Sequence, residues 1–123
     1  MKILVVDDDA EIRVGLKRLL EDNGHDNVMT ARSVTEALGL IKRPVNVVEW
    51  QVELIITALD MGHGTDGLDL IKKAGAKRLK AKFWLVSAGM NEKIASLAKE
   101  FGAEQAIDKS ALLIALKEKG LIT

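Results

Sequence analysis

The chain opens with an unbroken apolar run that is followed at once by three acidic residues. Residues 3–6 read Ile-Leu-Val-Val, and Asp7, Asp8 and Asp9 come directly after them. A continuous apolar run of this length is typical of a strand buried on both faces, as in a parallel sheet. The three carboxylates would then lie at the carboxyl end of that strand, the edge where open α/β sheets bind ligands. The pattern predicts an α/β fold with an acidic site at one edge of its sheet.

The crowding of the three carboxylates has two explanations. Like charges at short range raise at least one pKa unless a cation neutralises them, and Mg²⁺ is a hard cation that prefers oxygen ligands. Alternatively, an Asp that precedes a helix caps it by accepting hydrogen bonds from free N–H groups. Because one Asp is enough for a cap, we favour a metal site and leave capping open.

Strand-like and helix-like segments alternate along the rest of the chain. Apolar spacing predicts helices over residues 10–22, 34–43, 68–75, 92–101 and 111–119, the last one capped by Ser110. Further strands are expected at 27–31, 52–57, 83–86 and 105–107. This alternation predicts a flavodoxin-like (βα)5 sandwich with parallel strand order 2-1-3-4-5, in which residues 1–123 form a single domain.

The segment 45–51 has the least clear pattern. Val45, Val47 and Val48 allow an extra strand, and Trp50 is suited to cover the bottom of the core. The pattern alone establishes neither.

The composition narrows the function classes. The 18 basic and 18 acidic residues balance, so the charge favours neither nucleic acid nor an anionic membrane as a partner. The absence of Cys excludes disulfides, thiolate metal sites and a Cys nucleophile. Neither a signal peptide nor a membrane span is recognisable, and the cytoplasm is the expected location.

Five segments in a fixed order carry a family resemblance. They read ILVVDD at 3–8, ELIIT at 53–57, DGL at 66–68, LVSA at 85–88 and IDK at 107–109. Together they resemble the receiver domain of two-component response regulators, over essentially the whole chain. The resemblance implies a signalling function in a phosphorelay, with a sensor histidine kinase or a phosphotransfer protein as partner. In that family a phosphohistidine passes its phosphoryl group to an Asp at the end of the third strand.

The resemblance also implies roles for five residues of this chain. Asp8 would be a direct Mg²⁺ ligand and Asp7 a ligand through water, and Asp60 would contribute its main-chain carbonyl. Ser87 would be the hydroxyl that contacts the phosphoryl oxygens, and Lys109 would supply the fixed positive charge. These roles agree with phosphoryl transfer as a reaction of positioning and charge neutralisation.

The phosphoacceptor of the family is missing from this chain. The family places it five residues after the acid that opens the third strand, and here that position is Ala58. A methyl group can neither accept a phosphoryl group nor ligate a metal, so we expect no phosphorylation and only weak Mg²⁺ binding. Asp60 lies two residues later, on the same side by strand parity, and is a less favoured substitute acceptor.

The presence of alanine at position 58 has two possible explanations. The chain could be a natural pseudo-receiver that acts by binding alone, or an Asp→Ala variant of a working receiver. We favour the second, because an abandoned site has no reason to keep a costly pair of like charges at Asp7 and Asp8. A metal-dependent enzyme on a flavodoxin-like fold is a third possibility. Acids rather than a Gly-rich phosphate loop follow the first strand, so we expect no enzyme activity.

Other departures from the family concern the geometry around the site. Gly62 replaces a usual Pro in a loop that is one residue longer, and Ser110 replaces the Pro that usually follows the Lys, which leaves the geometry of the Lys109–Ser110 peptide open. Ala106 stands where the family often has a switching aromatic, so we expect no aromatic switch. His63 is expected to be an exposed loop residue.

Two further segments each allow either a structural or a functional explanation. The run from Ala111 to Leu116 is apolar on all sides, which fits either a deeply packed helix or a surface for a homodimer or an output partner. The basic residues between 72 and 82 are expected to form a solvated face rather than a nucleic-acid site.

Overall fold

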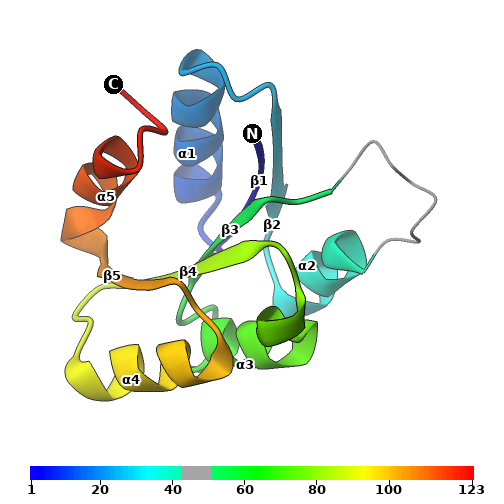
Figure 1. Ribbon diagram of the computed structural model, residues 1–123, viewed down its shortest axis with the longest axis vertical. Coiled ribbons are helices and arrows are strands. Elements are labelled where there is room, and N and C mark those ends of the chain that lie inside the picture. The colour runs from blue at the N-terminus through cyan, green and yellow to red at the C-terminus, as the bar shows by residue number, and fades with distance from the viewer. Residues whose placement is uncertain (43–50) are drawn as a thin grey trace.

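The computed structural model describes residues 1–42 and 51–123 of the chain (Figure 1). The predicted extra strand at Val45, Val47 and Val48, and the covering role of Trp50, lie outside the described residues. No helix of the described part is long and apolar enough to span a membrane.

Five parallel strands form one sheet in the order β2-β1-β3-β4-β5, which confirms the predicted topology. The strands are β1 (Lys2–Val6), β2 (Asn27–Ala31), β3 (Leu54–Ala58), β4 (Lys82–Ser87) and β5 (Gln105–Asp108). The third strand begins two residues later than predicted and includes Ala58. Ala58 pairs with Val86 of β4, so the candidate acceptor position lies within the sheet at its carboxyl edge.

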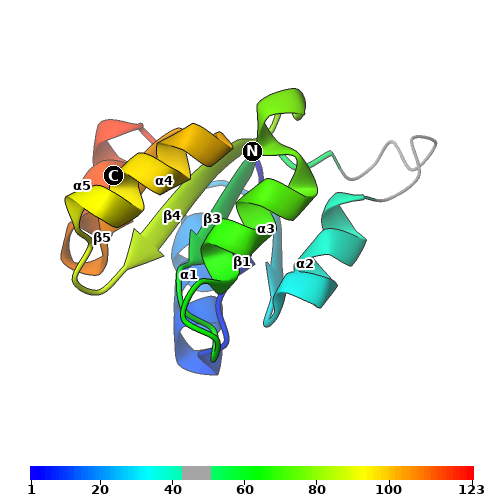
Figure 2. The ribbon, with the colours of Figure 1, turned by 90° about the horizontal axis from the view of Figure 1, so that it is seen from below.

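Helices cover both faces of this sheet. Figure 1 shows α1 (Ala10–Asp22) and α5 (Leu112–Glu118) on one side, and α2 (Val34–Ile41), α3 (Asp66–Ala74) and α4 (Glu92–Phe101) on the other. Figure 2 shows these last three helices in front of the sheet. Two short 3-10 helices, η1 (Ala76–Arg78) and η2 (Lys109–Ala111), complete the described elements. The result is a three-layer α/β/α sandwich.

The apolar run of β1 is buried on both faces, which explains its lack of alternation. Leu4 and Val6 pack into the core under α2, α3 and α4. Ile3 and Val5 pack into the second core, under α1 and α5. All four residues are at most 1 % exposed. Because the strand is sealed from above and below, its ligand-accessible end is the carboxyl edge, where Asp7 follows.

The predicted cap of the last helix is wrong. Ser110 lies inside η2, where the Asp108 carboxylate accepts its N–H at 3.1 Å and its hydroxyl at 2.6 Å. The short Asp108 side chain reaches two residues ahead and closes the 3-10 turn, so α5 begins only at Leu112. The Lys109–Ser110 peptide is trans, as are all the peptide bonds in the described segments.

The apolar run of the last helix divides between core and surface. Leu112 and Leu116 are 8 % and 0 % exposed and pack from α5 into the core that it shares with α1 and the sheet. Leu113 and Ile114 are 52 % and 59 % exposed. The helix therefore buries one stripe and leaves two large apolar side chains in solvent. The basic residues around η1 whose side chains the structure describes are exposed, as predicted.

Candidate functional site at the carboxyl edge of the sheet

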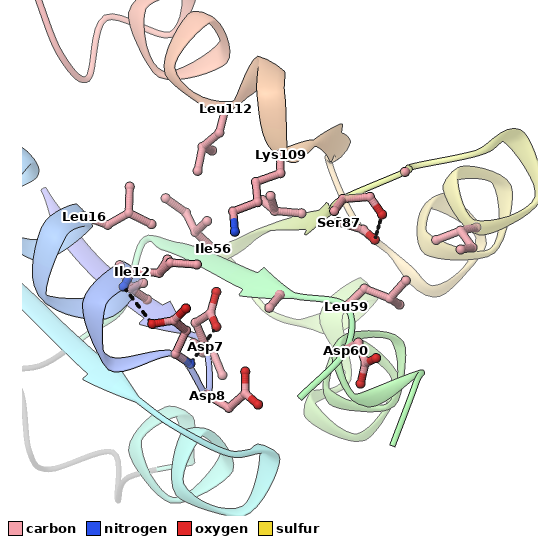
Figure 3. Close-up of a pocket in the computed structure, with 18 of the residues that line it drawn as sticks. Asp7, Asp8, Ile12, Leu16, Ile56, Leu59, Asp60, Ser87, Lys109 and Leu112 are labelled. Atoms are coloured by element: carbon pink, nitrogen blue, oxygen red, sulfur yellow. Dashed lines mark hydrogen bonds between the residues drawn. The ribbon is translucent and has the colours of Figure 1, made fainter. Parts of the chain in front are cut away.

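The three N-terminal acids divide into one capping residue and two that remain available. The Asp9 carboxylate accepts the N–H groups of Glu11 at 2.9 Å and Ile12 at 3.4 Å, which caps α1. Asp7 is half-buried and accepts the N–H of Asp9 at 2.9 Å, whereas Asp8 is exposed. Capping therefore accounts for one carboxylate and leaves Asp7 and Asp8 facing the site (Figure 3).

The Asp7 carboxylate is held in an unfavourable environment. Burial raises its pKa above the ordinary value, and the negative charges of Asp8 and Asp9 act in the same direction. The hydrogen bond from the Asp9 N–H lowers the pKa only in part. Arg13 from α1 donates to the Asp7 main-chain oxygen at 2.6 Å, which fixes this turn and places a positive charge beside it. A cation bound at Asp7 and Asp8 would relieve the remaining repulsion.

Ala58 occupies the end of the third strand, and the start of α3 packs tightly against it. The Thr57 hydroxyl donates to the Ala58 main-chain oxygen at 3.0 Å. Gly67 lies so close that a Cβ on it would overlap that same oxygen and come within 2.5 Å of Leu85 Cδ1. The helix predicted over residues 68–75 in fact begins at Asp66, so this contact was not predicted from the sequence. The contact fixes the backbone beside the candidate acceptor position.

The loop between β3 and α3 is organised by two carboxylates. Asp60 accepts the N–H groups of Gly62 and Gly64, each at 2.9 Å, and these bonds hold its pKa below the ordinary value. Its side chain is exposed and one of its oxygens is already used within the loop. Its main-chain carbonyl remains the atom that the sequence assigned to a metal. These bonds argue against Asp60 as a substitute acceptor.

Asp66 is the second of these carboxylates, and no functional role for it was predicted from the sequence. It is 7 % exposed and accepts the N–H groups of Met61 at 2.7 Å and His63 at 3.0 Å. The His63 ring Nδ1 lies 2.8 Å from its other oxygen. Burial raises the Asp66 pKa, but the bonds from Met61 and His63 outweigh it, and the net shift is downward. The His63 side chain is 82 % exposed, which confirms that it is a surface loop residue.

Ser87 and Lys109 follow the two neighbouring strands. Ser87 ends β4, and its hydroxyl donates to the Ala88 main-chain oxygen at 3.0 Å. Lys109 follows β5 directly, and its side chain extends over Ile56 (Figure 3). Within the described ranges, Lys109 forms no ion pair with a carboxylate. Its ammonium is thus available to a group that enters the site.

One cavity of about 500 Å³ is lined by all six site residues that the family resemblance implied. Its lining includes the predicted metal ligands, the acceptor position, the hydroxyl and the lysine, namely Asp7, Asp8, Ala58, Asp60, Ser87 and Lys109. These residues come from four different strand ends. The parallel topology therefore brings them to one edge, as expected for an open α/β sheet.

The oxygen donors of this cavity fit a hydrated Mg²⁺ ion better than a fully enclosed one. In the part of the chain that the structure describes, no three acidic or His side chains are arranged to hold a metal. Asp7 and Asp8 offer two carboxylates, and Asp60 adds a main-chain carbonyl. Mg²⁺ commonly keeps several waters and takes only one or two protein carboxylates.

Comparison with known families and structures gives one consistent result. Residues 3–119 match the model of the response regulator receiver domain. A chemotaxis protein CheY homolog of Campylobacter jejuni is 36 % identical over 78 residues, which is 63 % of this chain and 55 % of that protein. The match thus spans little more than half of that relative's length.

Solved structures of similar fold come from several organisms. A CheY-like receiver domain protein of Methanospirillum hungatei is 27 % identical, with a TM-score of 0.74 over 96 % of this chain and 91 % of the other. A response regulator of Burkholderia pseudomallei, solved with a phosphorylated aspartic acid, calcium ion and citrate, is 26 % identical. Its TM-score is 0.77, over 94 % of this chain and 65 % of the other.

Proposed function

The chain belongs to the response regulator receiver domain family, and from this membership we propose that it is a two-component receiver that cannot take up a phosphoryl group, because Ala58 occupies the acceptor position. The observation that carries the proposal is the position of Ala58. It ends β3 and lines one cavity with Asp7, Asp8, Ser87 and Lys109. The rest of the site is therefore present around a methyl group.

The chemistry of the missing step defines what each residue is proposed to do. Transfer to an aspartate needs a nucleophilic carboxylate, a divalent cation and positive charge on the transferred oxygens. Asp8 would ligate the cation directly, Asp7 through water, and Asp60 through its main-chain carbonyl. Lys109 would neutralise the phosphoryl oxygens and Ser87 would hydrogen-bond them. The Ala58 methyl has no lone pair and makes the site incomplete.

The retained acids support a lost or deliberately removed acceptor over a long-abandoned site. Asp7 is half-buried beside Asp8, and burial together with that negative charge raises its pKa. A pair of this kind costs stability unless it serves a cation. We therefore propose an Asp→Ala variant of a working receiver, in which Mg²⁺ binds weakly. A metal-dependent enzyme is not supported, since receiver domains are not an enzyme family.

A natural pseudo-receiver is the second candidate, and the surface of α5 is what favours it. Leu113 and Ile114 are more than half exposed, which is unusual for adjacent large apolar residues. A homodimer or an output partner would cover them. In either case we propose that residues 1–123 form one receiver domain, whose upstream partner is a sensor histidine kinase or a phosphotransfer protein. The structurally similar response regulator of Burkholderia pseudomallei carries a phosphorylated aspartic acid, which is the kind of product such a transfer would give.

Restoring the carboxylate tests the proposal. With Mg²⁺ and a small labelled acyl phosphate, the parent chain should take no label, and Ala58→Asp should form a base-labile acyl phosphate. Ala88→Asp is the matched control, because Ala88 is exposed and lines the same cavity but does not end β3. It should stay unlabelled.

Two outcomes would contradict the proposal. A folded Ala58→Asp variant that takes no label would show that the site is not a silenced receiver. Equal labelling of both variants would show that position 58 has no special role. Mg²⁺ should also bind the Ala58→Asp variant more tightly than the parent, because that variant adds a third carboxylate to the cavity.

A further inference from the structure

The cavity has an apolar floor that the proposed phosphoryl chemistry does not use. Beyond the polar mouth it extends onto the face of the sheet that α1 and α5 cover (Figure 3). The floor comes from three strands and the walls from two helices, and it is lined by Val5, Ile56, Val86, Ile12, Leu16 and Leu112. A phosphoryl group and its metal would occupy only the polar mouth.

The size of this space is that of a small-molecule site. Protein interiors are close-packed and rarely leave voids larger than a water molecule. A cavity of about 500 Å³ falls within the range of roughly 300–1,000 Å³ that is usual for ligand pockets. The walls also remain accessible, since Ile12 and Leu16 of α1 are only half-buried. Val5 and Ile56 at the bottom are only 1 % and 2 % exposed, so the apolar surface that a ligand can reach is mainly that of Ile12 and Leu16.

The negative charge at the mouth of the cavity favours a ligand that carries a positive charge. Asp7, Asp8 and Asp60 line it with carboxylates, against the single ammonium of Lys109. This excess of negative charge repels carboxylates and bare phosphates. A hydrated metal ion would neutralise the charge but leave the exposed parts of Ile12 and Leu16 in contact with water. A neutral apolar molecule would cover the floor but leave the acids unpaired.

Ala58 joins the two halves of the cavity. It projects from the same side of β3 as Ile56, and both line the cavity. The methyl group continues the apolar floor up to the acidic mouth, where a carboxylate would interrupt it. A ligand with a charged head next to an apolar body therefore matches the surface of this chain better than that of a chain with Asp at position 58.

We propose that the cavity binds a small primary amine with an apolar chain. The ammonium lies beside Asp7 and Asp8, and the chain lies along the half-buried Ile12 and Leu16 of α1. This binding does not require phosphorylation, so it goes beyond the proposed signalling function and can fail or succeed separately from it.

Titration with hexylamine, followed by NMR of the labelled protein, tests the proposal. Resonances of Ile12, Leu16 and Ile56 should shift together with those of Asp7 and Asp8. Hexylamine should bind roughly tenfold more tightly than butylamine, because two more methylene groups leave water. Hexanol and hexanoate should bind at least tenfold more weakly than hexylamine, since neither can pair with the acids. Mg²⁺ should compete with hexylamine.

Variants separate the head of the ligand from its tail. Ile12→Gln should weaken hexylamine binding severalfold and leave Mg²⁺ binding unchanged, whereas Asp8→Asn should weaken both. Val14→Gln is the matched control on the same helix, because Val14 is 66 % exposed and lies outside the cavity lining.

Three results would overturn the proposal. If butylamine binds as tightly as hexylamine, or if Ile12→Gln has no effect, the amine contacts only the acids. If hexanol binds as tightly as hexylamine, the acids play no part. Each of these results would overturn amine binding even if the Ala58→Asp variant proves to be a working receiver.

Discussion

Replacing Gly67 with alanine should destabilise the backbone that supports the candidate site. Gly67 is the second residue of α3, and its N–H donates to the Leu59 main-chain oxygen at 2.7 Å. An added Cβ would overlap the Ala58 main-chain oxygen and lie 2.5 Å from Leu85 Cδ1. Ala58 belongs to a strand in the middle of the sheet, so its oxygen cannot move away cheaply. The start of α3 must shift instead.

Two opposing effects set the magnitude. Overpacking against a rigid neighbour costs up to about 3 kcal/mol, and the better helix propensity of alanine returns about 1 kcal/mol. The net loss should be about 2 kcal/mol, which lowers the melting temperature of a domain of this size by roughly 6–10 °C. The shift of the helix should also change the amide resonances of Ala58 and Leu59.

Urea denaturation followed by circular dichroism measures this effect. Gly15→Ala is the matched control, because Gly15 lies within α1 and an added Cβ meets nothing within 4 Å. That substitution should raise stability by about 0.5–1 kcal/mol. If Gly67→Ala is as stable as the parent while Gly15→Ala behaves as expected, the close packing of α3 on the end of β3 is not rigid and the reasoning fails.

Four further variants test the electrostatics and the surface. Asp66→Ala should cost about 3 kcal/mol because the buried N–H of Met61 loses a charged acceptor. Because the folded-state pKa of Asp66 is depressed, this stabilisation is fully present above its ordinary pKa of 3.8 and is lost as the pH falls through the depressed value. The Asp66→Ala variant lacks this carboxylate, so its stability should fall less in acid than that of the parent chain. Asp7→Asn should raise stability at neutral pH, because the raised pKa of Asp7 shows that its ionised form is unfavourable in the folded state. This gain in stability should shrink in acid, where Asp7 is protonated. A loss of stability at pH 7 would contradict the reasoning. Ile114→Glu should abolish any self-association that α5 mediates, which analytical ultracentrifugation measures, and should leave the fold intact, which circular dichroism measures. Leu112→Glu should instead unfold the chain, because Leu112 is buried.

The fold was predictable because its signals are local and repeated. Apolar runs without alternation marked strands buried on both faces, as Ile3 and Val5 illustrate by packing on the opposite side from Leu4 and Val6. The strand order then followed from general rules for α/β sheets. The cap of the last helix was predicted wrongly because Asp108 forms the 3-10 turn with Ser110. The sequence pattern does not show which of these two polar residues, two positions apart, will act as a cap.

The candidate site was predictable in its members but not in its shape. Strand ends placed Asp7, Asp8, Ser87 and Lys109 on one edge, and the structure brings them to one cavity. The contact of Gly67 with Ala58 depends on how α3 packs against β3, which no local pattern specifies. The same holds for the apolar floor, which depends on the spacing of α1 and α5. The apolar run of the last helix likewise does not show that Leu112 is buried and the adjacent Leu113 exposed, because that depends on how α5 is oriented against the sheet.

The most direct test of a silenced receiver is an NMR titration of Ala58→Asp with beryllofluoride in the presence of Mg²⁺. Beryllofluoride mimics a phosphoryl group on an aspartate, so it requires the nucleophilic carboxylate and the groups around it. The resonances of Ser87 and Lys109 should shift in the Ala58→Asp variant and remain unchanged in the parent chain. If the folded variant shows no change at these two residues, Ala58 does not stand in for a phosphoacceptor, and the pseudo-receiver explanation takes precedence.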